Sequence, residues 1–261
     1  VRDYLNMKKV FDEAQPEVVF HLAAQPIVRD GYTEPRYTYE TNVMGTVNIL
    51  ECIRNTNCVR SFLNVTTDKV YLNKEWIWGY RENDELDGYD PYSNSKSCSE
   101  LVTHSYKNSF FGDGKVAIST ARAGNVIGGG DFASDRIIPD CIRAAMAKQN
   151  IVVRNPFSIR PYQYVLEPLY VYLLIASMQY NDGDYAGCYN IGPDECDCIE
   201  TGKLVDIFVE KWGEGISWVN KCDEGPHEAK LLKLDCSKLK NKFGWQPRWN
   251  IDMAIEKVIE W

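Results

Sequence analysis

Apolar segments short enough for buried strands alternate along this chain with longer segments of helical spacing. The strand-like segments are residues 17–22, 62–66, 116–121 and 188–191. Helical spacing of apolar residues is found at 3–14, 36–54, 92–110, 136–148 and 167–178. Strands and helices that alternate in this way form parallel βαβ units with right-handed crossovers. The sequence therefore predicts an α/β fold built on a doubly wound parallel sheet.

The second half of the chain has a less regular pattern and predicts a smaller α/β lobe beyond Gly192. Its expected strand is residues 230–234 and its expected helices are 204–212 and 236–243. A strand is also expected at 151–154, before the lobe, and helical spacing is found at 251–261.

One turn that normally accompanies such a sheet is missing. A doubly wound sheet usually opens with a strand and a Gly-x-x-Gly-x-x-Gly turn that holds a pyrophosphate at a helix N-terminus. The 261 residues contain no such turn, and the cluster Gly128-Gly129-Gly130 follows a late strand and precedes Asp131. Either the chain is a fragment without its first βαβ units, or it does not bind a dinucleotide.

Two further features favour the fragment. The strand at 17–22 would have an unpaired side in the absence of earlier strands, and the helical spacing of 251–261 stops without a capping residue. We therefore expect truncation at both ends, and we expect the segment as given to be inactive and not to bind NAD appreciably.

Composition excludes several classes of protein. A net charge of −8 argues against nucleic-acid binding, so any anion site must be built locally from arginines. The nine cysteines include no Cys-x-x-Cys pair and the three histidines lack partners at metal spacing, which indicates free thiols in a reducing cytoplasm and no metal site. No apolar stretch approaches the roughly 20 residues that span a bilayer, so we expect a soluble protein with no membrane partner.

Tyr92 and Lys96 form the pair most suggestive of chemistry. On a helix, residues four apart share one face and lie about 6 Å apart along the axis. A neighbouring ammonium would lower the pKa of the phenol from its usual value near ~10 and would favour the phenolate, which could then accept a proton from a hydroxyl group. Because Tyr-x-x-x-Lys also occurs by chance on amphipathic helices, its surroundings decide the interpretation.

Those surroundings favour a site. Thr66, Thr67 and Asp68 come at the carboxyl end of the strand at 62–66, which is where open α/β sheets bind their ligands. Pro91 precedes Tyr92 at the expected start of the helix, where its missing N–H has no cost.

Several longer stretches are similar to one family of enzymes. They are residues 20–25, 39–46, 75–81, 123–131, 165–168, 226–229, 233–237 and 244–248. On these stretches the chain resembles the extended short-chain dehydrogenase/reductase family, and within it the CDP-D-glucose 4,6-dehydratases. Asp68-Lys69 distinguishes this branch, because the dTDP-glucose dehydratases carry Asp-Glu at the same two positions.

The resemblance implies a domain division and an assembly. It implies a cofactor-binding Rossmann-type domain over residues 1–128, to which 165–192 return, and a substrate-binding lobe over 129–164 and 193–261. It also implies a homo-oligomer that takes part in deoxysugar biosynthesis for the lipopolysaccharide O-antigen.

The resemblance further implies a reaction. NAD would oxidise the sugar at C4 transiently, water would be lost across C5 and C6, and reduction at C6 would leave CDP-4-keto-6-deoxy-D-glucose. Tyr92 would take the proton of the 4-hydroxyl with Lys96 beside it, Thr67 would hold that hydroxyl, and Asp68 would protonate the departing 6-hydroxyl. Lys69 would be the base at C5, or else an electrostatic anchor for the enolate or a partner of Asp68.

The remaining candidates surround these residues. Cofactor contacts are expected from Thr66, Tyr92 and Lys96, from the small residues of Ala23-Ala24-Gln25, and from Asn42, which could otherwise be a capping or solvated residue. Substrate contacts are expected from Asn125, Arg136 and Arg160, since arginine offers bidentate donors to a diphosphate, and from His227 with Glu228. Arg136 and Arg160 could alternatively be ordinary surface residues.

Two other functions stay open. The first is another nucleotide-sugar enzyme: a 4-epimerase, or a dehydratase of dTDP- or GDP-sugars. The second is a non-catalytic dinucleotide-sensing protein, which the presence of both Tyr92 and Lys96 disfavours.

Overall fold

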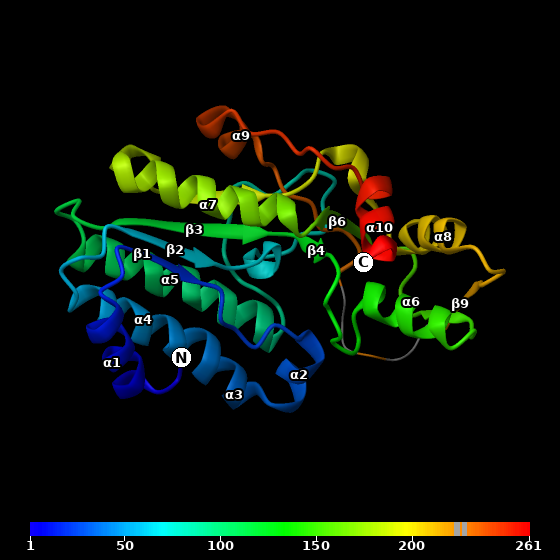
Figure 1. Cartoon of the computed structure of the whole chain (residues 1–261), viewed down its shortest axis with the longest axis horizontal. Coiled ribbons are helices and arrows are strands. Elements are labelled where there is room, and N and C mark those ends of the chain that lie inside the picture. Colours follow the sequence, from blue (N-terminus) through cyan, green and yellow to red (C-terminus); the bar gives the residue numbers. More distant parts are fainter. Residues whose placement is uncertain (222–224, 226–228) are drawn as a thin grey trace.

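The fold is a four-stranded parallel sheet with helices on both faces and a smaller lobe at one end (Figure 1). The computed structural model describes residues 1–221, 225 and 229–261. The helices are α1 (Tyr4–Ala14), α2 (Val28–Thr33), α3 (Pro35–Tyr39), α4 (Gly45–Arg54), α5 (Pro91–Phe110), α6 (Ile137–Met146), α7 (Leu166–Asn181), α8 (Thr201–Trp212), α9 (Ser237–Phe243) and α10 (Ile251–Glu260). The strands are β1 (Val18–His21), β2 (Ser61–Val65), β3 (Ala117–Ala123), β4 (Asn125–Ile127), β5 (Ile151–Val153), β6 (Ile159–Tyr164), β7 (Cys188–Ile191), β8 (Cys198–Glu200) and β9 (Trp218–Asn220).

The main sheet has the strand order β1-β2-β3-β7, and all its pairs are parallel. Its interior strands consist mainly of apolar and small residues because helices cover both faces, with Asn64 in β2 and Arg122 in β3 as the larger polar exceptions. Helices α1, α4 and α5 lie on one face and α7 lies on the other, as Figure 1 shows. The predicted doubly wound parallel sheet is confirmed.

Each face of the sheet has its own core. On the α4 and α5 side, Leu50, Ile53 and Phe62 are almost fully buried. On the α7 side, the core is formed around Val171 and Ile175. The strands are therefore held between two apolar layers, which fixes the edge at which all four carboxyl ends emerge.

Side-chain caps mark the beginning of α1, α5 and α10. Asp90 accepts a hydrogen bond from the backbone N–H of Ser93 at 3.0 Å, and Pro91 occupies the first turn of α5. Asn250 caps α10 in the same way through the N–H of Met253. Asp90 thus sets the start of the helix that carries Tyr92, and Asn250 sets the start of a helix in the lobe.

The lobe contains two small sheets and a third core. Its sheets have the orders β4-β6-β8 and β5-β9, and α6, α8 and α10 pack around them. Strand β6 was not predicted, because Arg160, Pro161 and Gln163 interrupt its apolar pattern. The predicted strand at 230–234 is wrong: Leu231 and Leu234 form only isolated bridges, to Ile159 and Tyr80.

The segment at 36–54 is helical, but the prediction of one continuous helix there is wrong. Helices α3 and α4 are joined by a π-helical turn, η1 (Glu40–Met44), and α2 precedes them without having been predicted. Such turns contain an extra residue that rotates the side chains after it around the axis. Asn42 and Thr46, four residues apart on one helix face, are both buried in the protein interior, at 1% and 0% exposure.

We predict that Gly88→Ala destabilises the protein by about 1–3 kcal/mol through overpacking. A Cβ at Gly88 would lie 2.3 Å from the carbonyl carbon of Ser93 in the first turn of α5, so this turn would have to move. Equilibrium urea unfolding measures the change. The matched control is Gly183→Ala, because a Cβ at Gly183 meets no atom within 4 Å. Equal stability losses in the two variants would contradict this account of Gly88.

Candidate active site

The carboxyl end of β2 turns sharply and presents three polar side chains. The backbone N–H of Thr66 donates to the carbonyl of Ala121 at 2.8 Å, which continues the pairing of β2 with β3 by one residue. Asp68 then begins a single 3-10 turn, which Thr67 caps. The hydroxyl of Thr67 donates to Asp68 Oδ1 at 3.0 Å. Thr67 and Asp68 are thus held together directly above the strand end.

Tyr92 lies against this turn from the first turn of α5. It is 8% exposed, and its phenol lies beside the side chain of Thr67. Burial raises the pKa of Tyr92 to about 12; the charge of Asp68 raises it further, while Thr67 and Arg136 oppose the shift. The predicted lowering of the pKa of Tyr92 by Lys96 is therefore wrong in this structure, because desolvation is the largest influence.

Lys96 is directed at the sheet. It is 5% exposed, and its Nζ donates to the carbonyl oxygen of Val65 at 3.0 Å. Burial lowers the pKa of Lys96 to about 8, and the carboxylate of Glu100 raises it. The ammonium therefore sits between the end of β2 and the face of α5 that also carries Tyr92.

The surroundings of Asp68 favour the protonated form of its carboxyl group. Its side chain is 1% exposed, and its Oδ2 has no hydrogen-bond partner among the described residues. Burial raises the pKa of Asp68, with Lys69 as the strongest opposing charge and Arg160 also opposing. A carboxyl group kept protonated in this way can act as a general acid.

Most of these side chains, though not Lys96, line one large cavity of about 960 Å³. Thr67, Asp68, Lys69 and Tyr92 form part of one wall, and the substrate candidates Asn125, Arg136 and Arg160 lie in the same lining. The sequence thus predicted residues that the fold brings together from the turn after β2, from α5, from β4, from the start of α6 and from β6.

The three substrate candidates differ in their surroundings. Asn125 is the first residue of β4. Arg136 forms an ion pair with Asp131 at 3.1 Å, whereas Arg160 is 7% exposed and donates to the carbonyls of Ile159 and Ala229. His227 and Glu228 lie outside the described residues.

The cofactor candidates after β1 form a separate hydrogen-bonded cluster. Ala23, Ala24 and Gln25 occupy the segment between β1 and α2. Asn42 accepts from the N–H of Gln25 at 2.8 Å and donates to the carbonyl of Gln25 at 3.0 Å and to Ser95 Oγ at 2.9 Å. Asn42 therefore ties this segment to α5, one residue before Lys96.

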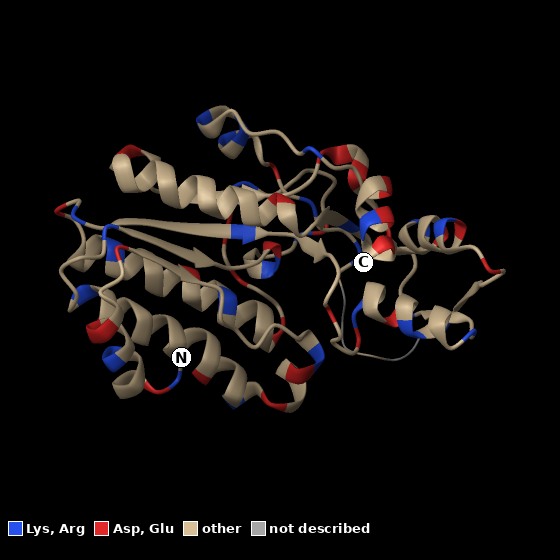
Figure 2. Cartoon of the chain, viewed as in Figure 1, with Lys and Arg blue, Asp and Glu red and all other residues tan. Residues whose placement is uncertain are grey.

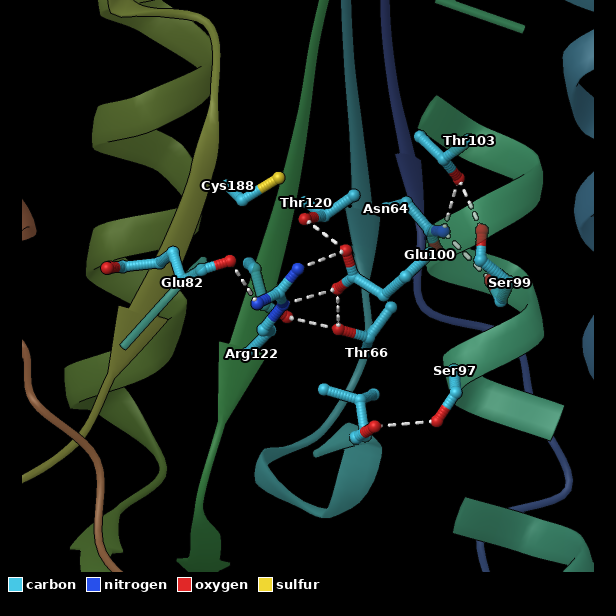
Figure 3. A network of polar contacts seen from close by, with 12 residues as sticks. Asn64, Thr66, Glu82, Ser97, Ser99, Glu100, Thr103, Thr120, Arg122 and Cys188 are labelled. Carbon is cyan, nitrogen blue, oxygen red and sulfur yellow. Dashed lines mark hydrogen bonds and ion pairs between the residues drawn. The ribbon is translucent and has the colours of Figure 1, made fainter. Parts of the chain in front are cut away.

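A buried ion pair lies beneath the site and was not predicted (Figure 3). Glu100 and Arg122 are 2% and 3% exposed, and Arg122 donates through two nitrogens to the two carboxylate oxygens at 3.0 Å each. Thr66 and Thr120 also donate to the carboxylate of Glu100, at 2.5 Å and 2.7 Å. Two sequence signals could have revealed the pair: Glu100 stands eight residues after Tyr92 on one face of α5, and Arg122 interrupts a segment of small residues in β3.

Two kinds of feature are not found among residues 1–221, 225 and 229–261. Within these ranges no helix is both long and apolar enough to cross a membrane, and no group of three or more His, Cys, Asp or Glu residues could hold a metal ion.

The chain matches a family model described as GDP-mannose 4,6 dehydratase over residues 1–258. It is also similar to the CDP-glucose 4,6-dehydratase of Salmonella typhimurium strain LT2. The identity is 46%, and the match covers 100% of this chain and 74% of that protein.

Solved structures with the same fold include nucleotide-sugar enzymes. UDP-glucose 4-epimerase from Thermotoga maritima, in complex with UDP-glucose, superimposes with a TM-score of 0.87 at 22% identity, covering 99% of this chain and 81% of that one. dTDP-glucose 4,6-dehydratase from Bacillus anthracis, in complex with NAD, gives a TM-score of 0.79 at 20% identity, covering 100% and 76%.

We predict that Glu100→Gln destabilises the protein by about 3–5 kcal/mol, because it leaves the Arg122 guanidinium buried and unpaired. Removing both charges with Glu100→Gln and Arg122→Met should cost less than Glu100→Gln alone. Urea unfolding of the two variants measures the difference. The control is Glu51→Gln, whose exposed partner Arg54 should make the change smaller than about 1 kcal/mol. A double variant less stable than Glu100→Gln would contradict this role of the pair.

Proposed function

Because the chain belongs to the family described as GDP-mannose 4,6 dehydratase, we propose that it is an NAD-dependent nucleotide-sugar 4,6-dehydratase. Its substrate is CDP-D-glucose and its products are CDP-4-keto-6-deoxy-D-glucose and water. The 46% identity to the Salmonella enzyme supports this substrate. The observation that carries the proposal is the contact of Thr67 with both Asp68 and Tyr92 in the wall of the large cavity.

The residues present fit the nicotinamide end of NAD. Lys96 supplies buried N–H donors beside the end of β2, and Tyr92 supplies a phenol on the same helix face. Thr66 and the small residues Ala23 and Ala24 border the same region of the sheet edge. When bound, NAD supplies the two-electron oxidation at C4 of the sugar and the matching reduction at C6.

Tyr92 and Thr67 act on the 4-hydroxyl of the sugar. Thr67 orients this hydroxyl, and the Tyr92 oxygen accepts its proton while C4 is oxidised to a ketone. Because burial favours the neutral phenol, the charge of the phenolate must be stabilised by groups at the site, and Thr67 and Arg136 both lower the pKa of Tyr92. The resulting ketone acidifies the hydrogen at C5.

Asp68 acts at the other end of the elimination. Its raised pKa keeps a proton available, and this proton goes to the departing 6-hydroxyl, which leaves as water. Lys69 lines the same cavity and either accepts the C5 proton or stabilises the enolate as a cation.

We assign the two parts of the chain separate tasks. Residues 1–128 and 165–192 hold the cofactor, while 129–164 and 193–261 bind the nucleotide and sugar through Asn125, Arg136 and Arg160. His227 belongs to the same proposal. We further propose a cytoplasmic homo-oligomer that works in deoxysugar biosynthesis for the lipopolysaccharide O-antigen.

We predict that Asp68→Asn lowers dehydration of CDP-D-glucose by the intact protein roughly 100- to 10,000-fold, because an amide cannot donate the acid proton. Mass spectrometry of CDP-, dTDP-, UDP- and GDP-glucose incubations with NAD detects the loss of one water. Tyr92→Phe should also abolish dehydration. Turnover of dTDP-glucose alone would refute the CDP assignment, and 4-epimerisation that survives Asp68→Asn would identify an epimerase.

We predict that dehydration falls as pH rises through about 8, because Lys96 loses its charge there. We expect the fall at this pH because burial places the pKa of Lys96 below its usual value of 10.5, so the ammonium loses its proton earlier as pH rises. Lys96→Arg keeps a cation at every pH and should remove this alkaline decline even if its maximal rate is lower. If the activity of Lys96→Arg fell with the same midpoint pH as that of the unmodified protein, Lys96 would be excluded as the origin of the decline.

The lowered pKa of Lys96 also affects how the stability of the fold depends on pH. Between pH 8 and 10.5 the unfolded chain binds the proton that folded Lys96 has lost, so this group makes the folded state more stable as pH rises through that window. Lys96→Met should flatten this part of the stability curve.

A further inference from the structure

Glu100 and Lys96 lie one turn apart on the buried face of α5. Residues four apart on a helix share a face, and these two side chains are 2% and 5% exposed. The carboxylate of Glu100 accepts from the hydroxyl of Thr66 at 2.5 Å, a contact that Figure 3 shows. The ammonium of Lys96 donates to the carbonyl of Val65, one residue earlier, at 3.0 Å. Two consecutive residues thus hold the anion and the cation at the same end of β2.

Arg122 of β3 shares this carboxylate. Figure 2 shows β3 as a strand of the main sheet with a charged segment, which is Arg122. Its guanidinium donates to both oxygens of Glu100, at 3.0 Å each. Burial lowers the pKa of Lys96 to about 8, and of the two charges in the pair it is Glu100 that opposes this shift. The carboxylate therefore acts on Lys96 as well as on Arg122.

The other ionisable groups around Lys96 are in their neutral forms or act elsewhere. His21 of β1 is neutral, because burial and the charge of Lys96 lower its pKa to about 3. Tyr92 on the same helix face is a neutral phenol, because burial raises its pKa to about 12. Asp68, in the turn after β2, has a raised pKa of its own and acts on Tyr92. The turn η1 and α4 present uncharged side chains to this face of α5. Among the described residues, Glu100 is therefore the anion that favours the charged form of Lys96.

We propose that Glu100 is a positioning residue of the reaction, and that its carboxylate keeps Lys96 in the ammonium form beside Tyr92. This inference rests on the proposed dehydration, because there the cation of Lys96 supports the transfer of a proton to Tyr92. Without Glu100, burial would act on Lys96 unopposed, and the neutral amine would be the main form already near neutral pH. The buried pair thus has a second task besides joining α5 to β3.

A purely structural role for Glu100 makes a different prediction for one variant. If the pair only joins α5 to β3, the double variant Glu100→Gln with Arg122→Met, which leaves no unpaired charge, should regain both stability and activity relative to Glu100→Gln. If Glu100 acts on the charge of Lys96, the double variant should regain stability alone. Its Lys96 should still lose its proton at a lower pH than in the unmodified protein.

NMR of the full chain, labelled with carbon-13 at the Cε atoms of lysine, follows the ionisation of Lys96 directly, and Lys96→Met identifies its signal. We expect a midpoint near pH 8 in the unmodified protein. Glu100→Gln and the double variant should each lower it by about 1–3 pH units, as loss of a close opposite charge does. Glu100→Asp keeps the charge and should lower it much less. Glu51→Gln is the control, because its carboxylate pairs with Arg54 on α4.

The outcomes separate this inference from the proposed function. A midpoint that stays near pH 8 in the double variant would overturn the inference, whatever the activity, and this variant decides if Glu100→Gln does not fold. A lowered midpoint should be matched by an equal movement of the alkaline decline of dehydration, and a decline that does not move would overturn the role of Glu100 in the reaction. If no nucleotide sugar loses water with the intact protein, the proposed function fails, while a lowered midpoint still supports the action of Glu100 on Lys96.

Discussion

The buried pair of Glu100 and Arg122 is the interaction on which the geometry of the site depends. It joins the middle of α5 to β3, and the same carboxylate accepts from Thr66 at the end of β2. Arg122 also donates to the hydroxyl of Tyr71 and to the carbonyl of Glu82, which extends the connection into the segment after the site. A buried ion pair is seldom a net source of stability, so its value here lies in fixing three elements relative to one another.

Burial drives the ionisable groups of the site in one direction. It raises the pKa values of Tyr92 and Asp68 and lowers that of Lys96, so each group is shifted toward its neutral form. A neutral carboxyl suits proton donation without further adjustment. A neutral phenol does not suit proton removal, so the basic form of Tyr92 has to arise through its hydrogen bonds and nearby cations, among them Arg136. Proton removal by Tyr92 therefore depends on stabilisation from neighbouring groups, whereas proton donation by Asp68 does not.

The sequence allowed the main sheet and the residues of its carboxyl edge to be predicted, for a physical reason. Parallel strands buried on both faces are continuous apolar segments, and their ends are marked by polar residues such as Thr67 and Asp68. Local patterns could not reveal features that depend on distant partners. Strand β6 contains Arg160 and Pro161 and is recognisable only from its pairing with β4 and β8. The pKa of Tyr92 was predicted in the wrong direction, because spacing on a helix indicates neighbours but not desolvation.

The π-helical turn at Glu40–Met44 has a consequence for how this chain can vary. Asn42 reaches Ser95, and Thr46 reaches Ser99 at 2.8 Å, so two successive turns of one helix match two successive turns of another. Each residue advances a helix by about 100°. Deletion of a single residue between 40 and 44 would rotate the following residues by about 100° and turn one of these two side chains away from α5. Insertions and deletions are therefore far less tolerable in this segment than substitutions of its outward-facing residues.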